Sequence, residues 1–198
     1  MSVPARRGRP LRLLLLALLA LLLSACGGGL SGTGDLDYVP GQGSVAEVAP
    51  AERGEPVDLS GQSLEGDPVD LADTRGQVTV INVWWSGCGP CRAEMPMLVD
   101  VSEEKSDVAF LGINTRNPDR GTALAFQREF DVTFPSIYDN TGAPLLAFGG
   151  RYAPQGMPST VVLDEQGRVA ALITGPIPSQ LTLEQVIEGA STGSSTDG

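Results

Sequence analysis

The sequence contains no histidine, a single lysine and three cysteines among its 198 residues. Without histidine there can be no Ser–His–Asp or Cys–His catalytic unit. The common zinc, copper and non-haem iron sites that use histidine ligands are excluded for the same reason. The side chains left for chemistry are those of Cys, Asp, Glu, Tyr and Lys105.

Basic residues are also scarce in the part of the chain that is expected to fold. The formal net charge is −11, and Arg6, Arg7, Arg9 and Arg12 all precede the first acidic residue. Phosphate recognition needs clustered Lys and Arg, so neither nucleic acid nor anionic lipid headgroups are expected as ligands of the folded part. We interpret the acidity as a contribution to solubility.

The N-terminal residues resemble an export signal followed by a lipid-attachment site. Residues 1–12 are basic and lack acids, and Leu13–Leu23 is an unbroken Leu/Ala run. This run is too short to span a membrane but suits the apolar part of a signal peptide. The segment Leu23-Ser24-Ala25-Cys26 resembles a bacterial lipobox, in which the cysteine thiol is alkylated by diacylglycerol. The sequence therefore predicts a signal peptide over 1–25 and a lipid anchor at Cys26 on the extracytoplasmic side of the cell membrane.

Two segments of low complexity enclose one predicted domain. Residues 26–54 are rich in Gly, Ser, Asp, Pro and Ala without a period, which predicts a flexible tether. Such a tether would span roughly 30 Å and let the domain reach partners in the membrane. Residues 191–198 are small and polar, which predicts a disordered tail. The folded domain is thus expected over residues 55–190.

Hydrophobic patterning divides this domain into alternating strands and helices. Val78–Trp84 is nearly all β-branched or aromatic, as expected of a strand buried on both faces, and 108–114 is expected to be a second buried strand. The other expected elements are strands at 57–59, 69–71 and 136–138, helices at 91–102, 122–130 and 181–187, one or two helical turns at 144–148, and a hairpin at 160–163 and 169–173. This order predicts an α/β sandwich with a mixed central sheet.

The strongest motif lies where the first buried strand gives way to a helix. There Cys88-Gly89-Pro90-Cys91 places one cysteine at a helix N-terminus, whose free N–H groups and dipole stabilise a thiolate. Two intervening residues let one turn bring both sulfurs within bonding distance. Pro90 fits the first helical turn, where its missing N–H costs nothing. We expect Cys88 to attack a disulfide and Cys91 to resolve the mixed disulfide.

Other uses of this cysteine pair are poorly supported. A structural disulfide across so short a loop would contribute only about 2 kcal/mol. A zinc site would need two further ligands, and neither histidine nor a spare cysteine exists to supply them. Copper delivery in related folds adds a distant histidine to the cysteine pair, and peroxidases need a Pro-x-x-x-Thr-x-x-Cys loop; both are absent from this sequence. No metal or cofactor is expected.

From about Val57 to Ile187 the chain resembles thioredoxin-like proteins of the envelope disulfide-reductase group that includes ResA and TlpA. The matching residues are Val80-Ile81-Asn82-Val83-Trp84, the Cys-Gly-Pro-Cys motif, Arg92, Glu94-Met95-Pro96, Gly156-Met157-Pro158-Ser159-Thr160 and Asp164-Glu165-Gln166-Gly167-Arg168. The resemblance implies a thioredoxin-like sandwich with an N-terminal β-hairpin. It also implies an extra helix and strand between residues 114 and 149.

The resemblance also implies a substrate-binding role for two residues far from the cysteines. In this group Met157-Pro158 would be a cis peptide beside the disulfide, leaving the Met157 backbone free to pair with a substrate strand. Base rates alone give an X-Pro bond only about a 5–6% chance of being cis. The alternative is an ordinary proline at the start of a strand.

Three positions depart from the group and affect the predicted site. The residue before the first cysteine is usually Trp and here is Gly87, with Trp85 two places earlier, so the aromatic wall beside the thiol is rearranged or absent. Thioredoxin has a titrating Asp where this chain has Asn82, which makes Glu94 our candidate proton acceptor; the alternative is a surface glutamate. Gly89 replaces the Glu found between the cysteines of ResA itself.

These observations predict a lipid-anchored thiol–disulfide oxidoreductase. The resemblance implies an electron donor, kept reduced by a membrane thiol transporter of the CcdA/DsbD type, that reduces apocytochrome c or other envelope protein disulfides. The alternatives are a dithiol oxidase that inserts disulfides and a non-catalytic binding module of the same fold. The Gly-Pro dipeptide between the cysteines is typical of reducing thioredoxins and favours reduction.

Overall fold

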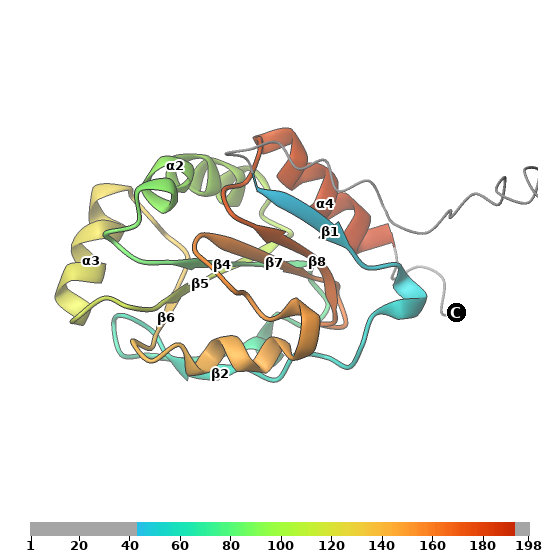
Figure 1. Cartoon of the computed structure of the whole chain (residues 1–198), viewed down its shortest axis with the longest axis horizontal. Helices are drawn as coiled ribbons and strands as arrows, with labels where there is room; N and C mark the ends of the chain where they lie inside the picture. Colours follow the sequence, from blue (N-terminus) through green and yellow to red (C-terminus); the bar gives the residue numbers. More distant parts are fainter. Residues whose placement is uncertain (1–42, 193–198) are drawn as a thin grey trace, which may run out of the picture. The chain divides into compact units, whose positions relative to one another are not determined.

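A computed structural model describes residues 43–192, which form a mixed sheet covered on both faces (Figure 1). The sheet has six strands in the order β1-β8-β7-β4-β5-β6; β4, β5 and β6 run parallel, and β7 is antiparallel to both β4 and β8. Its strands are β1 (Ser44–Glu47), β4 (Thr79–Trp84), β5 (Ala109–Asn114), β6 (Ser136–Tyr138), β7 (Ser159–Leu163) and β8 (Val169–Thr174). The predicted thioredoxin-like α/β fold with a mixed central sheet is confirmed.

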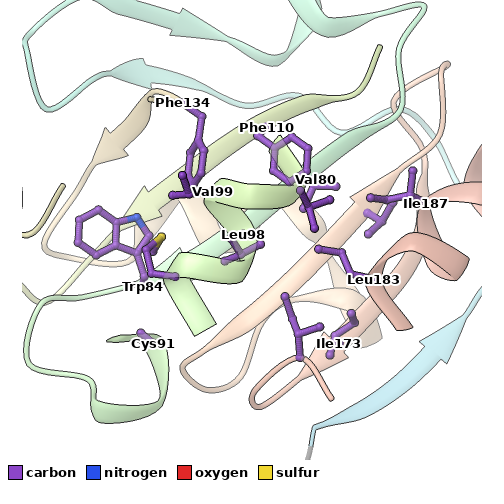
Figure 2. Close-up of a cluster of buried hydrophobic side chains, with 14 of the residues drawn as sticks. Val80, Trp84, Cys91, Leu98, Val99, Phe110, Phe134, Ile173, Leu183 and Ile187 are labelled. Atoms are coloured by element: carbon purple, nitrogen blue, oxygen red, sulfur yellow. The ribbon is translucent and has the colours of Figure 1, made fainter. Parts of the chain in front are cut away.

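Side-chain alternation along β4 divides the interior into two cores. Val80 and Trp84 belong to the core that includes residues of the helices, whereas Ile81 and Val83 face the opposite core. All six residues of β4 are buried, because this strand lies inside the sheet and both its faces are covered. Figure 2 shows side chains of the first core, of which Cys91 is a member.

Three α-helices follow the predicted order. These helices are α2 (Gly89–Glu104), α3 (Arg120–Glu129) and α4 (Gln180–Thr192), and Figure 1 shows α2 and α4 on the same face of the sheet. Asp119 caps α3 by accepting a hydrogen bond from Thr122 N at 2.8 Å. The expected helix and short strand between residues 114 and 149 are present as α3 and β6.

The opposite face is covered by a small hairpin and by three of the four short 3-10 helices. The hairpin pairs β2 (Ser60–Gln62) with β3 (Pro68–Asp70), and the 3-10 helices are η2 (Pro50–Glu52), η3 (Leu71–Thr74), η4 (Ala143–Phe148) and η5 (Gly150–Tyr152). Of these, η3, η4 and η5 contribute side chains to the second core. The first hairpin strand lies about three residues later than the sequence predicts. Val57 and Leu59 are buried in the second core all the same, so their alternation reports burial rather than strand pairing.

The prediction of a flexible tether through residue 54 is wrong for its last residues. Residues 44–47 form β1, which pairs antiparallel with β8 at the edge of the sheet. The helix α4 also continues to Thr192, two residues beyond the predicted domain end. The predicted signal peptide, Cys26 and the rest of the tether and tail lie outside the described residues. Within residues 43–192, no helix is both long enough and apolar enough to cross a membrane.

Arg53 attaches the end of this N-terminal segment to the domain. Its side chain is only 3% exposed, and its Nη1 lies 3.2 Å from the Oδ2 atom of the fully buried Asp164. The same guanidinium donates to the carbonyls of Gly189 and Ala190 near the end of α4, at 3.1 and 3.2 Å. Arg168 Nε also donates to Asp164 Oδ2, at 2.9 Å. This arrangement joins three segments that are distant in sequence.

Replacing Arg53 by Ala is expected to lower the free energy of unfolding by about 3 kcal/mol, because its almost fully buried guanidinium binds both the Asp164 carboxylate and the carbonyls at the end of α4. Urea unfolding followed by circular dichroism measures this change. The matched control is Arg168→Ala, whose more exposed ion pair should contribute about 1 kcal/mol or less. Equal losses in the two variants would contradict this role of Arg53.

Candidate active site

The two motif cysteines lie at the junction of β4 and α2 and form a disulfide. Cys88 is the N-cap residue of α2, and its Sγ accepts a hydrogen bond from Cys91 N at 3.2 Å. The sulfurs are 2.00 Å apart, with Cys88 6% exposed and Cys91 fully buried. Cys88 is therefore the more exposed of the two cysteines.

Asn117 holds the loop that leads from β4 to Cys88. Its Oδ1 accepts from Ser86 N at 3.0 Å, and its Nδ2 donates to Ser86 Oγ at 2.7 Å. Asn114 Nδ2 donates to the same Oδ1, and Tyr138 OH donates to the Asn117 carbonyl. Asn117 is fully buried, so these bonds are not exchanged with water. The loop before the reactive cysteine is therefore fixed by the segment that follows β5.

Trp85 rearranges the aromatic surface beside the disulfide. A Cβ atom added at Gly87 would lie 2.4 Å from Trp85 Cζ3 and 2.6 Å from Cη2. The six-membered ring of the indole therefore covers Gly87, the residue immediately before Cys88. An aromatic ring therefore lies next to Cys88, but it comes from Trp85, two residues before the position where the group usually has Trp. Only a glycine at position 87 leaves room for this ring. The aromatic wall beside the cysteine is therefore rearranged and not absent.

The substitution Gly87→Ala is expected to displace the Trp85 ring and to lower the free energy of unfolding by about 1 kcal/mol. Intrinsic fluorescence should change, because Trp85 is one of two tryptophans and would become more exposed. Gly89→Ala is the matched control, since a Cβ there meets nothing within 4 Å. An emission spectrum of Gly87→Ala that matches the wild type would contradict this packing.

Glu94 is buried next to the cysteines rather than on the surface. It is 5% exposed and follows Cys91 by three residues, on the same side of α2. Its Oε1 accepts from Asn82 Nδ2 and its Oε2 from Ile177 N, both at 2.9 Å. Burial raises the pKa of Glu94 to about 7, with the two hydrogen bonds offsetting part of that effect. Near neutral pH this carboxyl can both hold and release a proton.

The Met157–Pro158 peptide bond is cis, as the resemblance implies. Ser159 pairs with Val83 in the β4–β7 ladder, so Met157 and Pro158 lie across from the end of β4, where the active-site loop begins. Within the described residues, no hydrogen bond uses the Met157 backbone. The structure therefore brings the cis peptide, Trp85 and the cysteines to one end of the sheet.

Sequence reasoning missed the residues that hold these groups in place. Asn117 fixes the loop before Cys88, and Ile177 N together with Asn82 binds the Glu94 carboxylate. Thr160 Oγ1 accepts from Asn82 Nδ2 at 3.1 Å and so helps to orient that amide. One asparagine at the end of a buried strand and another three residues later were the available signal for the loop contacts. The backbone N–H of Ile177 leaves no signal in the sequence.

Three features together define a thioredoxin-like thiol–disulfide oxidoreductase. They are the cysteine pair at a helix N-terminus, the cis proline opposite it and the buried carboxyl. Comparison with known proteins agrees with this class. The Redoxin family model matches residues 47–187, and the chain belongs to this family.

Named relatives share the same chemistry. The chain is 31% identical to the thiol:disulfide interchange protein HelX of Rhodobacter capsulatus, over 72% of this chain and 74% of HelX. It is 32% identical to the thiol-disulfide oxidoreductase ResA of Geobacillus thermodenitrificans, over 59% of this chain and 66% of ResA. A secreted thiol-disulfide isomerase from Corynebacterium glutamicum has a similar structure, with a TM-score of 0.66, 31% identity, and coverage of 80% of this chain and 99% of that one.

Proposed function

We propose that this protein is an extracytoplasmic disulfide reductase, anchored by lipid at Cys26, that passes electrons from a membrane thiol transporter to oxidised envelope proteins. The observation that supports this direction of electron flow is that few groups are placed to stabilise a Cys88 thiolate once the disulfide is reduced. In the part of the chain that the structure describes, the one hydrogen bond to Cys88 Sγ comes from Cys91 N, and no cationic side chain bonds it. Strong oxidants of this class owe their potential to a stabilised reduced form.

The reduction proceeds through two exchanges. The Cys88 thiolate attacks a substrate disulfide, forming a mixed disulfide and releasing one substrate thiolate, which takes up a proton. Cys91 then gives its proton to the Glu94 carboxylate and attacks Cys88 Sγ, which forms the Cys88–Cys91 disulfide and releases the second substrate sulfur as a thiolate that takes up a proton from solvent. The transporter returns two electrons and two protons to this disulfide. Met157 and Trp85 are the proposed contacts with the substrate strand.

Substrate and location are proposed from the resemblance and the N-terminal sequence. The group that includes ResA and TlpA typically reduces the haem-binding cysteines of apocytochrome c, and oxidised apocytochrome c is the first substrate to test. A structural relative from Corynebacterium glutamicum is described as secreted, which supports an extracytoplasmic site of action.

Replacing Cys26 by Ser should move the protein from the membrane fraction to the soluble fraction without altering its redox chemistry.

A redox titration in dithiothreitol buffers tests the direction of electron flow. A reductase should have a potential near that of thioredoxin, about −270 mV. A value near that of DsbA, about −120 mV, would instead identify a dithiol oxidase.

A complementation experiment tests the non-catalytic alternative. In a strain that lacks the gene, a Cys88→Ser protein should fail to complement; full complementation would favour the non-catalytic binding module.

A further inference from the structure

A groove with a volume of about 490 Å³ opens beside Met157. It is lined by residues that follow β5 and β6 and by the loop that leads to the cis proline: Thr115, Arg116, Asn140, Thr141, Gly142, Leu145, Leu146, Ala153, Pro154, Gln155, Gly156 and Met157. We call it the Met157 groove. Its volume suits a few side chains of an extended segment. Because Met157 borders both, the groove is continuous with the active site.

Arg116 is held in the wall of the Met157 groove by the contacts that fix the active-site loop. The next residue, Asn117, binds both the backbone N–H and the hydroxyl of Ser86. Arg116 itself has a φ of 62°, a left-handed conformation that non-glycine residues seldom adopt. Such backbone outliers cluster at binding and catalytic sites. The position of Arg116 relative to Cys88 is therefore fixed by the hydrogen bonds between its neighbour Asn117 and Ser86.

Arg116 is the one charged residue that lines the Met157 groove, in a protein whose net charge is −11. Its side chain is exposed and makes no ion pair or hydrogen bond with any residue between 43 and 192. The neighbouring Asp139 is engaged by its own turn, where its Oδ1 accepts from Thr141 N and Gly142 N. A free cation at this place is complementary to a carboxylate.

The Met157 groove also has an exposed apolar wall. Leu146 is 78% exposed, and one other large hydrophobic side chain in the described region, Leu181 on α4, is exposed to a comparable degree. Leu145 and Met157 continue this apolar surface within the groove. An exposed leucine beside a free arginine would contact a segment that carries both an apolar and an acidic side chain.

We propose that the Met157 groove binds the polypeptide next to the reactive cysteine of the substrate and selects segments with an apolar residue and a carboxylate. This inference rests on the proposed disulfide reductase function and adds a substrate preference to it. A polypeptide is the occupant because the unpaired Met157 backbone at the groove edge can hydrogen-bond an extended chain. The carboxylate pairs with Arg116, and the apolar side chain packs on Leu146.

Two short disulfide peptides test the proposal, identical except that Leu-Glu flanks the cysteine in one and Leu-Gln in the other. Wild-type protein should reduce the Glu peptide with a kcat/KM about two- to fivefold higher, as expected of a partly exposed ion pair. Arg116→Gln should bring this ratio to about one, and Arg116→Glu should favour the Gln peptide. High salt should shrink the wild-type ratio, because it screens the pair.

Arg151→Glu is the matched control, since it reverses a charge nearby on η5 and outside the groove. The control should keep the wild-type ratio; a shift as large as that of Arg116→Glu would overturn the proposal, as would equal rates for the two peptides with wild-type protein.

Reduction of bis(2-hydroxyethyl) disulfide, which is uncharged and too small to fill the groove, is measured in parallel. If wild-type protein reduces it without discriminating between the peptides, the inference alone fails. If wild-type protein cannot reduce it, the reductase function fails as well.

Discussion

Between pH 4.5 and 7, the oxidised protein should lose about 3 kcal/mol of its free energy of unfolding, and the Glu94→Gln variant should not show this loss. The folded protein holds a proton on Glu94 up to about pH 7, whereas the unfolded chain releases it near 4.5. The folded state therefore binds more protons across this window. Stability is full below pH 4.5, falls as the pH rises through the window, and levels off above pH 7.

Urea unfolding of both proteins at a series of pH values measures this difference. The comparison of variant with wild type removes the contributions of the other carboxylates, which the two proteins share. Glu103→Gln is the matched control because Glu103 lies on the same helix, α2, and is exposed. Its pH profile should follow the wild type. Parallel profiles for wild type and Glu94→Gln would contradict the raised pKa of Glu94.

The same substitution should slow the resolution of the mixed disulfide by about 100-fold at neutral pH. Glu94 lies one helical turn beyond Cys91, and general-base assistance of this kind contributes about 10²-fold or more. In the wild type the resolution rate should rise with pH through about 7, the pKa of Glu94. In Glu94→Gln it should rise near the pKa of an unassisted thiol, about 8.5.

Stopped-flow release of a coloured aromatic thiol from a Cys88 mixed disulfide measures this step alone. The first attack, by Cys88 on a disulfide, should change far less, because the hydrogen bond to Cys88 Sγ comes from Cys91 N and not from the Glu94 carboxyl. Glu94→Asp should recover part of the lost rate, since it restores a titratable group. If the resolution rates of wild type and Glu94→Gln had the same pH profile, Glu94 would not be the proton acceptor.

Much of the fold could be predicted because its central elements carry strong local patterns. The strands β4 and β5 are mostly apolar, and the helix after Cys91 shows a regular apolar spacing. The strand β1 could not be predicted, since four residues in a Gly-rich and Ala-rich segment become a strand only by pairing with β8. Arg53 was missed for the same reason: its partner Asp164 is 111 residues away.

The candidate site likewise contains features that the sequence predicts and features that it does not. The cysteine pair and the cis proline belong to motifs and were expected, as was the position of Glu94 one turn after Cys91. The burial of Glu94 could not be predicted, because it depends on the Asn82 side chain and the Ile177 backbone from other elements. The placement of the Trp85 ring over Gly87 likewise depends on a loop conformation set by Asn117.

One short loop connects the entry of the chain into the domain with the proposed proton acceptor. Gly43 N donates to Pro176 O at 2.9 Å, and the next residue, Ile177, donates its N–H to Glu94. A shortened protein that starts at residue 55 would lose β1, Arg53 and the bond to Pro176 together. The carboxyl would then lie under a loop that is held from one side only, and its titration would no longer report on the intact enzyme. Recombinant forms made to measure the redox chemistry should therefore begin before Gly43.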